Sequence, residues 1–317
     1  MNAIVLTPIT QALQEGALTR QELKALMQRS NKPALLHLLL WFCVLGVTTT
    51  VVWISIGHWY LVPAMLIHGI VLVHHFSLQH ECCHYTAFKT RWLNDWVGNI
   101  CGLVIMLPNR FFRYEHCDHH TFTQIIGKDT EMIELPKSLL GYLLYISSYP
   151  YWQSKFSELW RHCLGRLTAN DKSFVPRQEW KTVIWEARFM AAFYAIVILV
   201  TALFQFWEVL WFWFLPVVLG EPVMRAIRMT EHVGRPTVTD MKTNTRSNRV
   251  ALPWRFLCWN MNYHAEHHYA SSVPFHALPA LSEKLEGYIY TEKQGYFGAH
   301  VDIVSQLIGK SPRSDSA

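Results

Sequence analysis

Charged residues are scarce in this chain: Asp, Glu, Lys and Arg together make up only 16% of its 317 residues. Soluble domains carry roughly 25%. This deficit, together with 51% hydrophobic residues, argues against an ordinary soluble enzyme and indicates contact with lipid. The net charge of +5 is also small. Because no basic patch interleaved with aromatic residues occurs, we expect no nucleic-acid partner.

Paired cysteines and a leader segment are lacking as well. The seven cysteines include no CxxC pair, and their odd number without regular spacing predicts free thiols in a reducing compartment. No signal peptide is evident, because residues 1–33 are polar or amphipathic and strongly apolar sequence begins only near Ala34. A capping box from Thr19 to Glu22 predicts a short helix within this first segment.

Four apolar segments have about the length of a membrane-spanning helix, which needs about 20 residues. They cover residues 34–56, 59–78, 189–204 and 206–223. The turns inside the first two and the last two are so short that each pair is predicted to form an antiparallel hairpin. Two shorter apolar pieces, 97–107 and 138–152, predict re-entrant or interfacial segments.

Basic residues are distributed unevenly around these segments, and this fixes the predicted orientation. Neither hairpin turn contains Lys or Arg. The segment before the first span and the loop after the fourth span contain eleven: Arg20, Lys24, Arg29, Lys32, Arg225, Arg228, Arg235, Lys242, Arg246, Arg249 and Arg255. By the positive-inside rule, both termini and residues 79–188 are predicted to lie in the cytoplasm. Only residues 311–317 are predicted to be disordered.

Histidine is abundant, with seventeen residues, and its placement is uneven. Three clusters follow the spacings i, i+3 and i+4, which put side chains on one face of a helix. Their members are His80 and His84; His116, His119 and His120; and His264, His267 and His268. All three clusters stand just outside apolar spans on the predicted cytoplasmic side. They can therefore converge at one depth, which predicts a metal site.

A pair of histidines four residues apart is more often structural than metal-binding. Chance, however, would have to produce HxxHH twice and HxxxH once on the same side of the membrane. Neutral imidazole suits iron, copper and zinc alike, but eight histidines exceed the four ligands of a tetrahedral zinc ion. Two metal ions that share eight or nine nitrogens are favoured. His232, just beyond the fourth span, is the ninth candidate, and an ion-paired loop around Glu231 and Arg228 is the alternative.

The remaining histidines lie outside these clusters. His74 and His75 fall within the second span, where they could support the site, carry protons or only pack between helices. Six others are interpreted as structural: His37, His58, His68, His162, His276 and His300.

The combination HECCH (80–84), HCDHH (116–120), TEH (230–232) and HAEHH (264–268) resembles the membrane fatty acid desaturase superfamily over residues 35–285. The stretches HECCHYTAF and NYHAEHH are similar to a bacterial branch that includes dihydrorhizobitoxine-desaturase-like proteins. The resemblance implies an all-α integral membrane protein of a bacterial inner membrane. Four transmembrane helices would form two hairpins, and a cytoplasmic helical cap would hold two iron ions on the eight clustered histidines and His232.

This resemblance divides the chain into three parts. Residues 1–33 are predicted to be an N-terminal amphipathic cytoplasmic segment, residues 34–285 a desaturase-like membrane and cap domain, and residues 286–317 a C-terminal cytoplasmic tail. Four carboxylates beside the histidines are candidates to orient the imidazoles: Glu81, Asp118, Glu231 and Glu266. Glu81 stands where many members of the superfamily carry Asp. Four basic residues could bind an anionic head group or face lipid phosphates: Arg110, Arg113, Lys128 and Arg246.

An enzyme of this kind would use O2 as co-substrate to introduce a C=C bond into a fatty acyl chain or a related lipid-like substrate. Hydroxylation of a lipid or of a small amino-acid-like molecule uses the same ligands and stays open. Outside the enzymes, a histidine-rich metal transporter or sensor is the alternative, although transporter ligands normally lie near mid-membrane. Because the sequence has no HPGG-like cytochrome b5 motif, electrons would come from an external donor such as a ferredoxin with its reductase.

Overall fold

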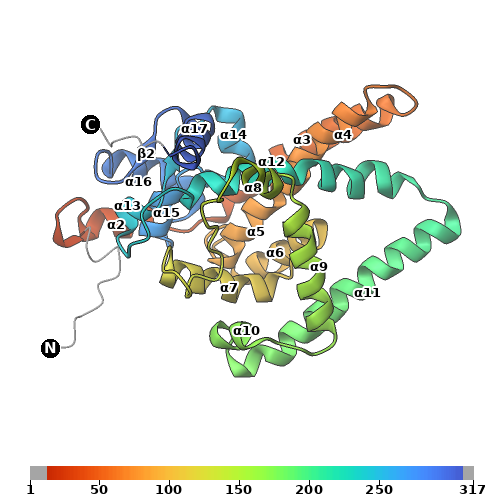
Figure 1. Ribbon diagram of the computed structural model, residues 1–317, viewed down its shortest axis with the longest axis horizontal. Coiled ribbons are helices and arrows are strands. Elements are labelled where there is room, and N and C mark those ends of the chain that lie inside the picture. Colours follow the sequence, from red (N-terminus) through yellow and green to blue (C-terminus); the bar gives the residue numbers. More distant parts are fainter. Residues whose placement is uncertain (1–12, 310–317) are drawn as a thin grey trace.

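The computed structural model describes residues 13–309, so the segment predicted to be disordered lies outside the described residues. Within residues 13–309 the fold is mainly helical, as predicted, and its strands are two residues long. Figure 1 shows two pairs of long helices that project to the right from a compact body of shorter helices. The body contains α2 and α17 and lies away from the tips of the projecting pairs.

Four helices of the described chain are long and apolar enough to cross a membrane. They are α3 (Asn31–Ser55), α4 (Leu61–Val73) continued by α5 (His75–Cys83), α11 (Trp180–Phe204), and the π-helical turn η2 (Leu210–Phe214) continued by α12 (Leu215–His232). Their outward surfaces carry exposed large hydrophobic side chains, such as Leu39 and Phe42 on α3. Such surfaces are stable in lipid and costly in water, which supports the membrane assignment.

Three of these helices run past the apolar segments that predicted them. The second continues from residue 78 to Cys83, the third begins at Trp180 instead of residue 189, and the fourth continues from residue 223 to His232. Hydrophobicity marks the part of a helix that faces lipid, whereas the extensions of the second and fourth helices are buried within the body. The extensions of α5 and α12 carry His80 and His232 into the protein.

Helices α4 and α12, which lead to these histidines, touch backbone to backbone. A Cβ atom on Gly69 would lie 1.9 Å from the carbonyl oxygen of Pro216, and one on Gly220 would lie 2.4 Å from the carbonyl oxygen of Gly69. Glycine at both positions therefore sets the separation of the two helices, as small residues commonly do in membrane bundles.

Replacing either glycine with alanine is expected to destabilise the protein, because the added methyl group must push two backbones apart. Overpacking of this kind typically costs about 1–3 kcal/mol. Thermal unfolding of the detergent-solubilised Gly69→Ala and Gly220→Ala variants measures the effect. Gly46→Ala in α3 is the matched control, because a Cβ atom there meets nothing within 4 Å. Equal unfolding temperatures for all three variants would contradict the proposed close contact.

Five shorter helices connect the two long pairs: α6 (Arg91–Ile105), α7 (Asn109–Phe122), α8 (Leu139–Ile146), α9 (Tyr149–Cys163) and α10 (Ala169–Phe174), with the 3-10 turn η1 (Arg177–Glu179) after them. The predicted interfacial pieces fall in α6 and across α8 and the start of α9. Trp92 and Trp96 are exposed on α6, and Leu140 is exposed on α8. Exposed aromatic and aliphatic side chains fit an interfacial location, which stays a prediction.

The last part of the body consists of short elements: α13 (Met241–Asn244), β1 (Ser247–Asn248), α14 (Leu252–Leu257), α15 (His264–Tyr269), η3 (Phe275–Ala277), α16 (Leu278–Lys284), β2 (Thr291–Glu292) and α17 (Gly295–Leu307). Strand β1 pairs in parallel with β2. A buried ion pair, 2.8 Å long, joins Arg246 to Asp302 of α17. The described residues after 285 are thus packed on the body, and the domain boundaries themselves stay predictions.

At the other end, α2 (Arg20–Leu26) begins with the predicted capping box: Thr19 and Glu22 cap each other's backbone N–H groups. Leu18 and Leu23 join the hydrophobic core of α15 and α16. Lys284 of α16 forms an ion pair with Glu22 at 2.6 Å. The N-terminal segment, from residue 13 on, is therefore attached to the same body.

Candidate metal centre

The nine histidines predicted as ligands converge inside the body from four helices. Two groups form, and within each group one nitrogen from every ring lies within 4.8 Å of the others. The first group consists of His80, His84, His116, His120 and His267, and the second consists of His119, His232, His264 and His268. The convergence that the sequence clusters predict is present in the structure.

The groups do not follow the clusters of the sequence. In each HxxHH cluster the first and last histidines stay together, whereas the middle one, His119 or His267, belongs to the other group. A helix turns by about 100° per residue, so residues i and i+4 point about 40° apart and residues i+3 and i+4 about 100° apart. Helices α7 and α15 therefore each serve both groups and hold them side by side.

The nitrogens within each group are spaced as metal ligands are. The Nε2 atoms of His116 and His267 each lie 3.0 Å from Nε2 of His120. In the second group, Nε2 of His264 lies 3.0 Å from that of His232 and 3.1 Å from that of His268. With metal–imidazole bonds of about 2.1 Å, neighbouring ligands are about 3.0 Å apart in an octahedron and about 3.4 Å apart in a tetrahedron. These spacings are short enough for the rings of each group to share one metal ion.

Several of these nitrogens are buried without a hydrogen-bond partner in the described part of the chain, including Nε2 of His84 and His119 and both ring nitrogens of His80. A buried polar atom left unpaired costs about 1–3 kcal/mol, and a bound metal ion would remove that cost. The donor set therefore fits a pair of metal ions.

Burial also keeps most of the imidazoles in the form that binds metals. Burial, followed by the charge of Arg113, lowers the pKa of His84 to about 3. Burial and the neighbouring imidazoles hold the pKa values of five other rings well below the usual range: His116, His120, His264, His267 and His268. These rings are neutral near pH 7 and present a free lone pair.

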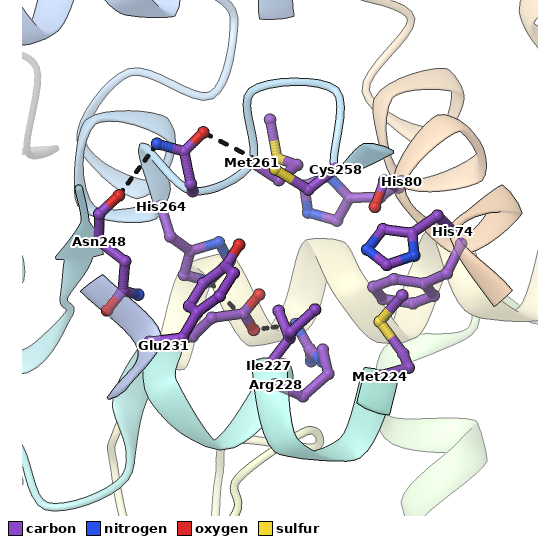
Figure 2. A pocket seen from close by; sticks show the side chains of 14 residues that line it. His74, His80, Met224, Ile227, Arg228, Glu231, Asn248, Cys258, Met261 and His264 are labelled. Atoms are coloured by element: carbon purple, nitrogen blue, oxygen red, sulfur yellow. Dashed lines mark hydrogen bonds and ion pairs between the residues drawn. The ribbon is translucent and has the colours of Figure 1, made fainter. Parts of the chain in front are cut away.

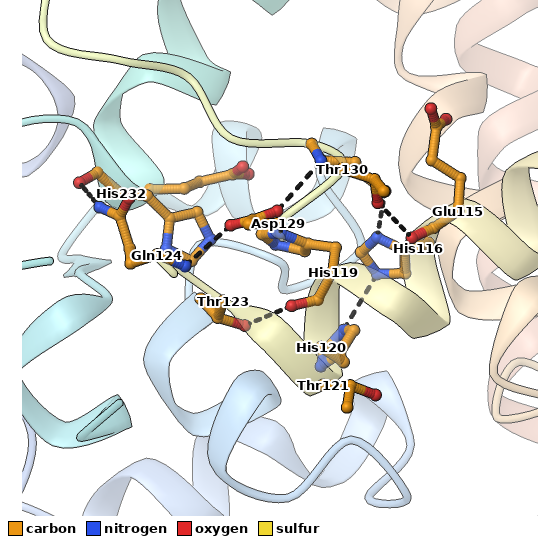
Figure 3. A network of polar contacts seen from close by, with 12 residues as sticks. Glu115, His116, His119, His120, Thr121, Thr123, Gln124, Asp129, Thr130 and His232 are labelled. Carbon is orange, nitrogen blue, oxygen red and sulfur yellow. Dashed lines mark hydrogen bonds and ion pairs between the residues drawn. The ribbon is translucent and has the colours of Figure 1, made fainter. Parts of the chain in front are cut away.

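Two carboxylates that sequence reasoning did not single out orient the rings of α7. Asp129 accepts a hydrogen bond from Nδ1 of His119 at 2.7 Å, as Figure 3 shows. Glu131 accepts one from Nδ1 of His116 at 2.8 Å. A partner on Nδ1 fixes the tautomer and directs Nε2 toward the metal. Burial opposes protonation of His119, but Asp129 and the charge of Glu131 outweigh it and raise the pKa of this ring.

The chain after α7 brings these carboxylates back to the helix that precedes them. Gly127 has a φ of +76°, a left-handed conformation that allows the chain to reverse. Asp129 also accepts hydrogen bonds from the backbone N–H of Gln124 at 2.8 Å and of Glu131 at 3.0 Å. The only sequence signal was a pair of acidic residues shortly after the second cluster, in the stretch GKDTE (127–131).

Arg228 links the two groups electrostatically. Its guanidinium donates to Glu131 at 2.7 Å and to Glu231 at 2.5 Å. Glu231 lies 3.7 Å from Nε2 of His264. One buried cation therefore holds a carboxylate beside each group, and of the four carboxylates predicted from the sequence Glu231 is the one that approaches an imidazole.

The other predicted carboxylates take different partners in the described part of the chain. Glu81 accepts hydrogen bonds from Thr86 at 2.9 Å and from the backbone N–H of Phe275 at 3.1 Å, and so joins α5 to the loop after α15. Glu266 accepts a hydrogen bond from the hydroxyl of Ser247. Asp118 is partly exposed and faces Thr130. Glu81 and Glu266 thus position the helices that carry histidines.

A narrow cavity reaches both groups from the side of α12. His80 of the first group and His264 of the second line it, together with the apolar side chains Phe76, Met224, Ile227 and Met261. Figure 2 shows His74 and Met224 on one side of this cavity and Asn248 on the other. His74 donates from Nδ1 to the carbonyl of Ile70 at 2.6 Å, and it belongs to neither group. Apolar side chains of the cavity wall therefore lie beside both candidate metal positions.

Comparison with known proteins agrees with this site. The family model described as fatty acid desaturase matches residues 56–299, which include all nine histidines. The chain belongs to the fatty acid desaturase family. It is therefore an oxidoreductase embedded in the membrane, and the transporter and sensor alternatives lose their support.

Individual relatives of the desaturase are distant. It is 24% identical over 283 residues to an sn-1 oleoyl-lipid 12-desaturase of Arthrospira platensis, covering 80% of this chain and 78% of the relative. An sn-1 oleoyl-lipid 12-desaturase of Anabaena variabilis is also 24% identical, with coverages of 75% and 74%. A chloroplastic omega-6 fatty acid desaturase of Glycine max is 24% identical, with coverages of 74% and 58%. The narrower dihydrorhizobitoxine-desaturase-like branch stays a prediction.

Proposed function

We propose that the desaturase holds two iron ions, one in each histidine group, and uses O2 to introduce a C=C bond into an acyl chain of a membrane lipid. The observation that carries this proposal is the presence of two adjacent groups of five and four imidazoles. Imidazole nitrogens suit iron, and fewer than six protein ligands in each group would leave room for O2.

The overall reaction removes two hydrogens from adjacent carbons. Two external electrons and two protons are consumed with O2, and the products are the alkene and two water molecules. Iron held by imidazoles supplies the oxidant for an unactivated C–H bond. The protein presents the carbons to that oxidant and keeps bulk water away from it.

The cavity beside His80 and His264 is the proposed position of the reacting carbons. Its lining methionines, Met224 and Met261, are flexible side chains that adapt to a hydrocarbon chain. The Arg228 side chain lies against the ring of Phe76, with its central carbon 5.2 Å from the ring centroid. Arg228 and Glu231 also line the cavity, so a buried ion pair lies beside the apolar side chains that would contact an acyl chain.

A membrane lipid as the carrier of this chain is supported by the four apolar helices and by the names of the relatives. We place both termini and the histidine groups in the cytoplasm, with the long helices as two transmembrane hairpins, because the basic residues follow the positive-inside rule. A soluble ferredoxin-like protein with its reductase would supply the electrons.

The proposal is tested by isolating the protein, measuring its metal content and following turnover in labelled O2. We expect about two iron ions per chain and an alkene product without label, with the labelled oxygen recovered in water. Label retained in the lipid product would favour the hydroxylase reading. Zinc in place of iron, with no O2 consumption, would contradict the proposal altogether.

Removing the charge of Asp129 is expected to lower activity by about 10–100-fold, the usual effect of losing a group that orients a metal-bound histidine. The Asp129→Asn variant tests this through turnover and iron retention during dialysis. Asp118→Asn is the matched control, since Asp118 lies in the same cluster but is partly exposed. An equal loss in both variants would show that the effect is not specific to the contact with His119.

A further inference from the structure

The body also contains an open groove. Two asparagines lie between this groove and the cavity beside the histidines. Its volume is about 990 Å³, at the upper end of the usual range for small-molecule sites, about 300–1,000 Å³. Asn248 and Asn262 line both the groove and the cavity. They are joined by hydrogen bonds of 2.8 and 3.0 Å, so this buried pair forms part of the wall between the groove and the cavity.

The groove is rich in cations. Five of its lining residues are basic and three are acidic; the basic ones are Arg235, Lys242, Arg249, Arg255 and Lys293. Lys242 forms an ion pair with Glu15, and Arg235 stacks on the ring of Tyr290 at 3.7 Å.

Three of the five cations form no ion pair within residues 13–309, the part of the chain that the structure describes. They are Arg249, Arg255 and Lys293. Nε of Arg255 is in addition a buried donor without a hydrogen-bond partner there. A groove that gathers three uncompensated cations and an unused buried donor is suited to an anion.

The groove opens beside the proposed membrane surface. Helix α14, which carries Arg255, packs on the first turns of α3: Nε2 of His37 lies 2.9 Å from the carbonyl oxygen of Phe256, and the two rings stack at 4.4 Å. Leu252, on the same helix as Arg255, is 73% exposed. An exposed apolar side chain on a helix that also carries a cation favours a lipid surface over an acidic soluble protein.

Three of the four basic residues named from the sequence as head-group candidates have ionic partners. Arg246 pairs with Asp302 in the interior, Arg113 pairs with Asp95 at 2.8 Å, and Arg110 lies 3.9 Å from Glu179. The fourth, Lys128, is exposed and lies over the ring of Phe122 at 5.3 Å. Because the groove gathers five cations, it is the better candidate for a charged head group.

We propose that this groove binds the phosphate-bearing head group of an anionic phospholipid, whose acyl chain passes Asn248 and Asn262 to reach the histidines. The destination of the chain rests on the proposed function, whereas the binding of the head group does not. The substrate class would then be an anionic phospholipid rather than a neutral or zwitterionic one.

Binding of short-chain lipids to the detergent-solubilised holoenzyme tests the proposal without turnover. We expect dioctanoyl-phosphatidylglycerol to bind at least tenfold more tightly than dioctanoyl-phosphatidylcholine. The triple variant Arg249→Gln, Arg255→Gln, Lys293→Gln should lose that preference, because each cation near an anionic lipid contributes about fivefold. Equal binding of the two lipids to the wild type, or an unchanged preference in the triple variant, would overturn the proposal.

Two further variants separate head-group binding from general damage. Glu286 lines the groove and is exposed, so Glu286→Gln should tighten binding of phosphatidylglycerol several-fold, which unfolding does not produce. Lys137 is exposed and lies outside the groove, so Lys137→Gln should leave binding unchanged. Weaker or unaltered binding in Glu286→Gln would count against the site.

Competition and kinetics distinguish the remaining occupants. Inorganic phosphate that displaces the lipid at equal concentration would show a site for free phosphate and overturn the proposal. A triple variant with an unchanged KM for phosphatidylglycerol but a raised KM for the electron donor would show that the groove docks an acidic protein. Equal binding of the two lipids by a wild-type enzyme that holds its iron and desaturates lipids would refute the groove and leave the proposed function standing.

Discussion

Alanine in place of His267 is expected to abolish desaturation and to remove about one of the two iron ions. His267 lies on α15 but belongs to the first group, which would retain four ligands, whereas the second group would keep all of its own. Loss of a ligand to one of the two proposed metal ions should lower the rate by several orders of magnitude, since the proposed reaction uses both ions together. Iron analysis together with product analysis measures both effects.

Pairs of substitutions make this expectation specific. His267→Ala combined with His80→Ala damages one group twice and should leave the second ion bound. His267→Ala combined with His264→Ala damages both groups and should release both ions, although these two residues stand in one sequence cluster. His276→Ala, outside both groups, is the control and should keep its iron. The reverse pattern in the two double variants would refute the crossed arrangement.

Replacing Arg228 with methionine is expected to be the most damaging single change outside the histidines. The buried guanidinium neutralises Glu131 and Glu231, and without it two carboxylates remain buried and uncompensated. Breaking a buried ion pair by removing one partner costs about 3–5 kcal/mol. Without Arg228, the carboxylate of Glu131 would also no longer hold the ring of His116 in place. Thermal unfolding and iron content should both fall.

A surface ion pair supplies the comparison for Arg228. Lys284 lies 2.6 Å from Glu22, and 38% and 39% of these side chains are exposed. Exposed pairs contribute little to the free energy of unfolding, so Lys284→Met should leave the unfolding temperature and the iron content nearly unchanged. Comparable losses of stability and iron in the two variants would mean that the effect of Arg228 does not depend on its buried ion pairs. A restoring effect of Glu231→Gln on Arg228→Met would support the electrostatic explanation.

The membrane part of the fold could be predicted from hydrophobicity because lipid selects apolar side chains over a whole helix length. The limits of the helices could not. Residues 79–83 and 224–232 are polar, and they are helical because their side chains are buried between other helices of the body. The parallel pairing of β1 with β2 rests on two residues from each strand, too few to leave a periodic signal.

The carboxylates beside the histidines were less evident from the sequence than the histidines themselves. Glu231 was chosen for its place beside His232, and it does approach an imidazole, that of His264. Asp129 and Glu131 were missed because they reach the rings through a reversal of the chain at Gly127 rather than through helical spacing. Contacts made across a loop depend on its conformation, which no short motif specifies.

The sequence by itself determined which histidines face inward together, because residues i, i+3 and i+4 of a helix share a face wherever that helix is placed. It also determined that the ligands follow apolar spans. Only the tertiary structure decided how nine histidines divide into five and four. The physical reason is that neighbouring residues such as His119 and His120 point about 100° apart, so which group each joins depends on the helices packed on either side.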